Sequence, residues 1–240
     1  MTPSANGPIV GMVDTSVDPP SQFSPYMLTP INVTGDQNTP GNEPTHGTIV
    51  LETLVDAMGN NPGKILPVDV YGSGDSTSVW ELLDGFYKAA QAGANLITIS
   101  SGGTGDSPMM KTMIEEAIAQ GIGVVAAAGN TPGQIDYPAS YPGVISVTAS
   151  KQTVNGPITG TSVTGGSVQL APYANDPPGT QIIAPGTTLV LWNGQTWVGE
   201  GTSFAAPSAT GTIVDLMNQY HISLSQAVNI VTKACPAPRK

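Results

Sequence analysis

Three polar residues of the chain could together carry out nucleophilic catalysis. Asp14 ends the apolar run 9–13, which places it at the carboxyl edge of an expected parallel strand, where such sheets usually hold their sites. His46 directly precedes the amphipathic stretch 49–58, so its imidazole should stand on the first turn of a helix. Ser203 lies in a glycine-led turn before the small-residue helix 205–217. A hydroxyl nucleophile, an imidazole base and a carboxylate that orients the base are the groups of acyl-transfer catalysis.

Each of these residues also has a purely structural interpretation. Asp14 could cap a turn, and Ser203 could be the N-cap of its helix. His46 could be a surface residue, which is how we interpret His221 in its polar segment. Small residues on both sides of Ser203 favour the chemical role, because they let another chain approach the hydroxyl. Backbone N–H groups at such a helix start can also bind a developing oxyanion.

A fourth candidate, Asn130, follows an apolar run and Gly129. An asparagine after a glycine is usually a turn residue. If its side chain projects into a cleft instead, the amide is a second oxyanion donor, which acts where charge develops in the transition state.

The elements that would position these residues alternate along the chain as short β-branched runs and amphipathic stretches, the pattern of a parallel sheet covered by helices. Capping signals at Ser78, Ser107 and Ser223 predict three helix starts. From 153 to 199 the pattern becomes short strands and Gly/Pro turns, without a linker or a repeat, so we expect one domain over residues 1–240. The expected strands are residues 8–13, 65–71, 95–100, 122–128 and 144–148.

Composition excludes several classes of function. The net charge is −10 and no basic cluster exists, which argues against a nucleic-acid partner. The longest apolar runs are far shorter than the roughly 20 residues that cross a bilayer, so no membrane partner is expected. The single cysteine, Cys235, allows no internal disulfide, and we interpret it as an incidental thiol. With 29 Gly and 22 Pro, the chain should carry its function on loops.

Taken together, the four segments resemble the subtilisin-like serine proteases, the subtilase family, and the order Asp, His, Ser is that of subtilisin. The segment 201–207 (Gly-Thr-Ser-Phe-Ala-Ala-Pro) matches the family's nucleophile signature, 46–48 (His-Gly-Thr) its histidine motif and 126–130 its oxyanion-asparagine segment. The resemblance extends over residues 8–234. It implies a three-layer α/β fold with a central, mostly parallel, twisted sheet flanked by helices.

The resemblance also implies an activity, that of a serine endopeptidase hydrolysing peptide bonds through an acyl-enzyme, without a cofactor. Ser203 would be the nucleophile, His46 the general base and Asp14 the residue that orients it. The Asn130 amide and the Ser203 backbone N–H would form the oxyanion hole. An extended peptide or protein substrate would pair with the segments around Gly72 and Ser100. The implied substrate-binding residues are Gly72, Ser100, Ser101, Gly102, Ala127, Ala128, Gly129 and Asp136.

Some residues depart from the family pattern. Thr15 and Ser16 follow Asp14 where the family usually has Ser or Thr and then Gly, which leaves the conformation of that turn open. Ser208 replaces a usual histidine. The loop before the strand at Ile65 lacks the asparagine-rich calcium-binding stretch of many relatives, so no metal site is expected there. The start at Met1 has no signal-peptide features. Secretion, a removed propeptide and a monomeric state are expectations from the resemblance.

Two other functions remain open. The same triad could serve a peptide ligase or macrocyclase, although a compact chain has little room for elements that shield an acyl-enzyme from water. The chain could instead be a catalytically inactive binding module with a subtilase fold, which the intact triad and Asn130 argue against. The role of Asp136 is also open, because its carboxylate could point into the pocket and select Lys or Arg, or turn outward and leave a pocket for apolar groups.

Overall fold

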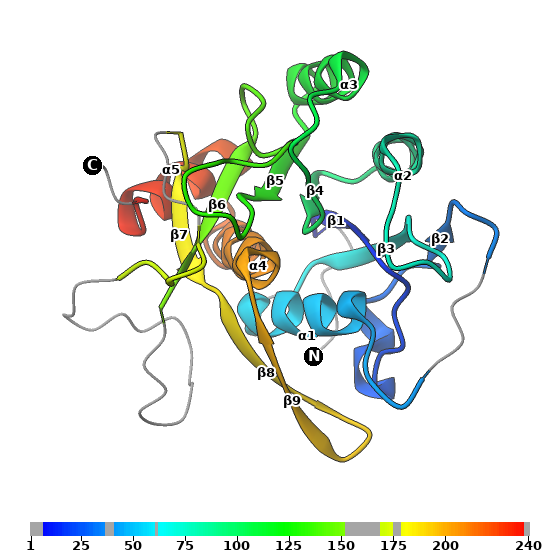
Figure 1. Ribbon diagram of the computed structural model, residues 1–240. Coiled ribbons are helices and arrows are strands. Elements are labelled where there is room, and N and C mark those ends of the chain that lie inside the picture. Colours follow the sequence, from blue (N-terminus) through cyan, green and yellow to red (C-terminus); the bar gives the residue numbers. More distant parts are fainter. Residues whose placement is uncertain (1–6, 37–40, 61, 152–168, 175–178, 238–240) are drawn as a thin grey trace.

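A single parallel sheet forms the centre of the computed structural model, which describes residues 7–36, 41–60, 62–151, 169–174 and 179–237. Its strand order is β2-β3-β1-β4-β5-β6-β7, and neighbouring strands are parallel throughout (Figure 1). This confirms the predicted α/β architecture. The strands are β1 (Ile9–Asp14), β2 (Ile31–Asn32), β3 (Lys64–Asp69), β4 (Leu96–Ile99), β5 (Gly123–Ala127), β6 (Ile145–Ser150) and β7 (Ile182–Pro185).

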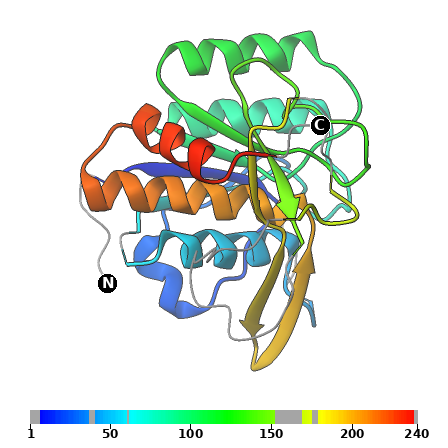
Figure 2. The ribbon, with the colours of Figure 1, turned by 90° about the vertical axis from the view of Figure 1, so that its left-hand side faces the viewer.

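Helices cover both faces of the sheet and make the fold three-layered. Figure 2 shows α2 and α3 on one face and α1 and α4 on the other. The predicted helix starts are confirmed, because the hydroxyls of Ser78, Ser107 and Ser223 each accept a hydrogen bond from a backbone N–H of the first turn. The helices are the 3₁₀ helix η1 (Ser21–Tyr26), α1 (His46–Met58), α2 (Val79–Gln91), α3 (Pro108–Ala119), α4 (Thr202–Tyr220) and α5 (Leu224–Ala234).

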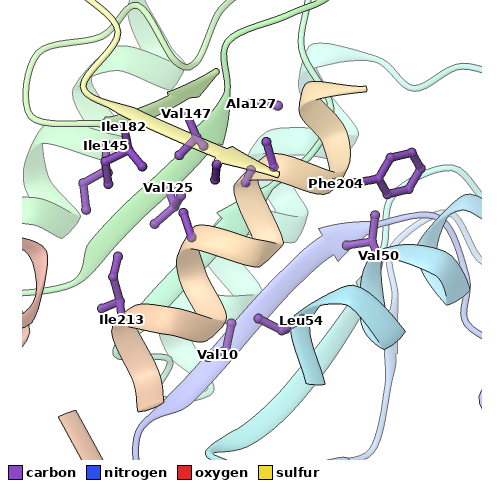
Figure 3. Close-up of a cluster of buried hydrophobic side chains, with 14 of the residues drawn as sticks. Val10, Val50, Leu54, Val125, Ala127, Ile145, Val147, Ile182, Phe204 and Ile213 are labelled. Carbon is purple, nitrogen blue, oxygen red and sulfur yellow. The ribbon is translucent and has the colours of Figure 1, made fainter. Parts of the chain in front are cut away.

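The strands bury side chains on both faces, which explains their continuous apolar sequence. On β5, Val124 packs into the cluster under α2 and α3, whereas Val125 packs into the cluster under α1, α4 and α5. Figure 3 shows this second cluster, to which β1 contributes Val10, β5 contributes Val125 and α4 contributes Ile213. These side chains hold α1 and α4 firmly against the sheet.

Helices α1 and α4 lie unusually close to each other at Gly211. A Cβ atom added there would be 2.5 Å from the Cβ of Ala57 and 2.6 Å from the carbonyl oxygen of Leu54. Only glycine permits this approach. Because α1 begins at His46 and α4 begins next to Ser203, the close packing fixes the distance between the histidine and the serine.

The carboxyl ends of three neighbouring strands bring the candidate residues to one edge of the sheet. Asp14 is the last residue of β1, Ser100 follows β4, and Asn130 lies three residues after β5. β1 is flanked by β3 and β4, so the crevice opens at a point where the chain order of the strands reverses. Open α/β sheets bind their ligands at such points.

The segment 153–199, predicted as short strands and turns, is described only in part. Residues 153–168 and 175–178 lie outside the described residues. The remainder forms β7 and an antiparallel hairpin, β8 (Thr187–Trp192) and β9 (Gln195–Glu200), which packs against α1 and leads directly into α4. The short elements η1 and β2 were not predicted.

Candidate active site

A buried carboxylate orients the imidazole of His46. Asp14 is fully buried, and its Oδ1 lies 2.8 Å from His46 Nδ1. The same oxygen accepts the Thr15 backbone N–H at 2.7 Å, which fixes the carboxylate from the other side. The His46 ring also packs on Phe204, with 5.3 Å between the ring centroids. Because Nδ1 is directed at Asp14, the other ring nitrogen is available to act on a substrate.

The pKa of His46 is raised above its ordinary value by this environment. Burial by itself lowers the pKa, because it disfavours the charged imidazolium. The negative charge of Asp14 and its hydrogen bond to the ring outweigh that effect and stabilise the imidazolium. The raised pKa makes the imidazole a stronger base for accepting a proton from a hydroxyl.

The turn after Asp14 forms without the family's glycine. Thr15 Oγ1 accepts the Gly47 backbone N–H at 2.8 Å, and Thr45 Oγ1 donates to the carbonyl of Ser16 at 2.6 Å. A Cβ atom at Gly47 would lie 2.4 Å from the Thr15 carbonyl oxygen. Gly47 therefore allows the turn after Asp14 to lie directly against the start of α1.

Ser203 stands in the first turn of α4 and forms two hydrogen bonds with Ser100. Ser100 Oγ donates to the Ser203 carbonyl at 2.8 Å, and Ser203 Oγ donates to the Ser100 carbonyl at 3.3 Å. Pro207 has no N–H to reach the Ser203 carbonyl one turn back, so the Ser100 hydroxyl serves that carbonyl instead. In the described part of the chain, Ser203 forms no hydrogen bond with His46.

Thr202 holds the side chain of Asn130. Asn130 Oδ1 accepts the Thr202 backbone N–H at 2.9 Å and the Thr202 hydroxyl at 3.0 Å. A backbone N–H can only donate, so the atom facing Thr202 must be the oxygen, and the amide nitrogen is left free for a ligand. Thr202 Oγ1 also accepts the Gly129 N–H at 3.1 Å.

A cavity of about 620 Å³ collects most of the sequence-predicted site residues. His46, Asn130 and Ser203 line it, while Asp14 lies buried behind His46. Six of the predicted substrate-binding residues line it as well: Ser100, Ser101, Gly102, Ala127, Gly129 and Asp136. The other described residues that line it are Thr15, Thr45, Tyr71, Gly74, Asp75, Thr131 and Thr202.

Two predicted substrate-binding residues do not line the cavity. Ala128 is fully buried, and its N–H pairs with the Val147 carbonyl of β6. Gly72 is buried with φ at +58°, and its N–H donates to Asp69 Oδ1 at 2.9 Å. The chain therefore turns inward at Gly72, and Tyr71, Gly74 and Asp75 form that wall of the cavity in its place.

Some site residues escaped prediction. The position of Thr202 directly before the candidate nucleophile Ser203 was a signal, but its partner Asn130 is 72 residues away in the sequence. Tyr71, whose hydroxyl donates to Ser101 Oγ at 2.9 Å, looked like an ordinary strand end. Across the residues that the structure describes, no three His, Cys, Asp or Glu side chains gather where they could hold a metal ion. Among the same residues, the helices are too short or too polar to span a bilayer.

Comparison with known proteins agrees with this geometry. The model of the subtilase family, peptidase S8, matches residues 5–232. The chain is 29% identical to subtilisin DY from Bacillus licheniformis over 92% of its own length and 80% of the relative's. It is 28% identical to M-protease from Shouchella clausii, of which it spans 52%.

Among solved structures, fervidolysin from Fervidobacterium pennivorans superposes with a TM-score of 0.73 at 26% identity, covering 93% of this chain and 38% of that one. Fervidolysin is described as a keratinolytic enzyme related to subtilisin. The family match spans nearly the whole chain, and the relatives are proteases. The chain therefore belongs to the subtilase family and is a subtilisin-like serine protease.

Proposed function

We propose that this protease cleaves extended peptides through an acyl-enzyme formed on Ser203. The observation that carries the proposal is the Asp14–His46 hydrogen bond of 2.8 Å beside a cavity that both Ser203 and Asn130 line. A buried carboxylate, an oriented imidazole, a hydroxyl and an amide donor at one cavity are the parts that acyl transfer needs. A binding module would have no use for this arrangement.

The reaction follows from the positions of these groups. His46 accepts the Ser203 proton as the hydroxyl oxygen attacks the peptide carbonyl, and Asp14 stabilises the imidazolium that forms. The Asn130 amide nitrogen and the Ser203 backbone N–H stabilise the negative oxygen of the tetrahedral intermediate. The imidazolium then protonates the leaving amine. Water attacks the acyl-enzyme with His46 again as base and releases the new carboxylate.

The substrate would bind as an added strand between two walls of the cavity. Ser100–Gly102 continue from β4 and present backbone groups on one side. The segment 71–75 forms the other side, and Tyr71 is tied to Ser101 through its hydroxyl. Pairing with the backbone on both sides binds a peptide with little regard to its sequence. We keep as predictions that residues 1–240 are one monomeric domain and that a propeptide is removed.

A fluorophosphonate probe applied to the whole chain tests the proposal. We expect the probe to label Ser203, found by peptide mapping, and mass spectrometry of a peptide mixture to show hydrolysed products. Ser203→Ala should abolish both while leaving the fold intact. Ser208→Ala, a buried serine on the same helix, is the matched control and should keep both. Turnover by Ser203→Ala would overturn the assignment, and products joined to an added amine in place of water would favour the ligase function.

A further inference from the structure

Asp136 lines the same cavity as Ser203 and forms no ion pair with another described residue. None of the described residues that line the cavity is a lysine or an arginine, and Asp136 belongs to neither the His46–Asp14 nor the Lys88–Asp84 ion pair. Burial raises the pKa of Asp136 above its ordinary value, as expected for a partly desolvated carboxylate. The mechanism leaves this group unused.

The backbone fixes Asp136 on the wall next to the nucleophile. Its N–H donates to the Ala128 carbonyl at 3.0 Å, and its carbonyl accepts the Ser140 N–H at 3.1 Å. Ala128 is two residues before Asn130, whose side chain is bound to Thr202. Asp136 therefore lies on the side of the cavity where the oxyanion hole would be.

Small residues lie beside Asp136 in the wall of the cavity. Gly102 faces it, since a Cβ atom at Gly102 would lie 3.2 Å from the Asp136 Cβ. Tyr137, the next residue, exchanges two backbone hydrogen bonds with Gly103, which ties the Asp136 wall to the segment that would pair with substrate. Ala127 and Gly129 complete this part of the cavity.

We propose that Asp136 selects substrates with Lys or Arg immediately before the scissile bond, an inference that rests on the proposed endopeptidase function. When the carbonyl oxygen of that residue occupies the oxyanion hole at Asn130, its side chain faces the wall of Ala127, Gly129 and Asp136. A carboxylate in a partly desolvated pocket attracts a cation more strongly than the same pair in water. Asp75, on the opposite wall, adds negative charge but is exposed, so its interactions are screened.

Matched peptides that differ only in Arg, Lys, Phe or Leu before the cleaved bond test the inference. We expect the parent to cleave the Arg and Lys peptides with the highest kcat/KM. Asp136→Asn should lower kcat/KM for these two by about 10- to 100-fold, since it removes a charge-assisted interaction, and leave the Leu peptide within about threefold. Asp75→Asn should lower kcat/KM for the Arg and Lys peptides much less than Asp136→Asn does. Glu115→Gln, an exposed carboxylate on α3, is the control for net charge.

The outcomes separate the inference from the function on which it rests. A parent that prefers Phe or Leu, an Arg preference that survives Asp136→Asn, or a loss caused by Asp75→Asn instead would overturn the role of Asp136. In each case continued cleavage of the Leu peptide and labelling of Ser203 would leave the endopeptidase function standing. If the parent neither cleaves any peptide nor takes the fluorophosphonate label, the proposed function fails and the inference fails with it.

Discussion

Asn130 is held by two hydrogen bonds from Thr202, the residue that precedes the proposed nucleophile. The backbone N–H and the hydroxyl of Thr202 both donate to Asn130 Oδ1, so the amide nitrogen keeps one orientation before any substrate arrives. A donor that is fixed in advance needs no reorganisation when charge develops on the substrate. Asn130 and the start of the helix that carries Ser203 are therefore built as one unit.

Asn130→Leu should lower kcat by about 10²–10³ with a nearly normal KM, a magnitude taken over from subtilisin, where loss of such a donor has been measured. The reason is that the amide would act on the transition state more than on the bound substrate. Steady-state kinetics on one peptide substrate measures both constants. Thr202→Val is the informative control. It removes the hydroxyl but keeps the backbone N–H that donates to Asn130, so it should lower kcat less than Asn130→Leu does. An unchanged kcat in Asn130→Leu would remove Asn130 from the oxyanion hole.

Asp14→Asn should move the titration of His46 to lower pH and reduce kcat by about 10⁴, the loss measured for the equivalent change in a serine protease with a Ser-His-Asp triad. Burial lowers the pKa of His46, and only the charge and hydrogen bond of Asp14 reverse that effect. Without the charge, burial dominates and the pKa falls. In the parent, kcat/KM should therefore decline on the acid side with a midpoint above 6.5, as His46 becomes protonated in the free enzyme.

NMR titration of the imidazole checks this prediction independently of activity. The measurement is made in a Ser203→Ala background, which prevents self-digestion. The chain has two histidines, and His221 at the far end of α4 serves as the reference signal. A His46 titration that stays in place after Asp14→Asn would contradict the coupling between the two residues.

Gly47→Ala should disrupt the Asp14 turn and lower both activity and stability. The added Cβ would lie 2.4 Å from the Thr15 carbonyl oxygen, so either the turn or the start of α1 must shift. A shift of about 1 Å at a catalytic residue can reduce the rate by about 10². The thermal midpoint of the Ser203→Ala form and kcat/KM of the active form are the two measurements. Gly105→Ala has open space around its Cβ and should leave both unchanged. Unaltered kinetics in Gly47→Ala would show that the turn tolerates displacement.

The sequence predicted the parts of the fold and site that depend on local signals. Caps at Ser78 and Ser223 marked their helices, and Asp14 was placed at the end of its strand by the apolar run before it. Features set by distant contacts were missed. The inward turn at Gly72 packs against Thr34, which is distant in the sequence and approaches it only in the folded chain.

Glu52 is the clearest example of a residue whose environment could not be predicted. It lies in the amphipathic stretch that became α1, yet it is only 6% exposed because the β8–β9 hairpin covers it. Leu191 of the hairpin supplies a backbone hydrogen bond, while Glu52 Oε1 has no partner among the described residues. Burial, with the nearby charge of Asp56, raises the pKa of Glu52 to about 7. The hairpin therefore covers a carboxyl group that is most stable in its protonated form.

Glu52→Gln should stabilise the protein above neutral pH and have little effect below about pH 5. The pKa of Glu52 is higher in the folded chain than its ordinary 4.5, so the folded state holds the proton more tightly than the unfolded state. The stability contributed by the protonated group is fully present below about pH 4.5 and is lost as the pH rises through about 7. Glutamine mimics the protonated form at every pH. At pH 8 the gain in unfolding free energy should be on the order of 1–2 kcal/mol after allowance for solvent screening.

Urea unfolding of the Ser203→Ala form between pH 5 and 8 measures this gain, with and without Glu52→Gln. The stability curves should run together at pH 5 and separate as the pH rises, because only the parent loses its proton. Glu116→Gln on the exposed face of α3 also removes one carboxylate, and it should give a small difference without that pH dependence. Curves for Glu52→Gln and its parent that stay parallel across the range would show that Glu52 titrates alike in the folded and unfolded chain. A gain confined to low pH would reverse the sign of the linkage and contradict a raised pKa.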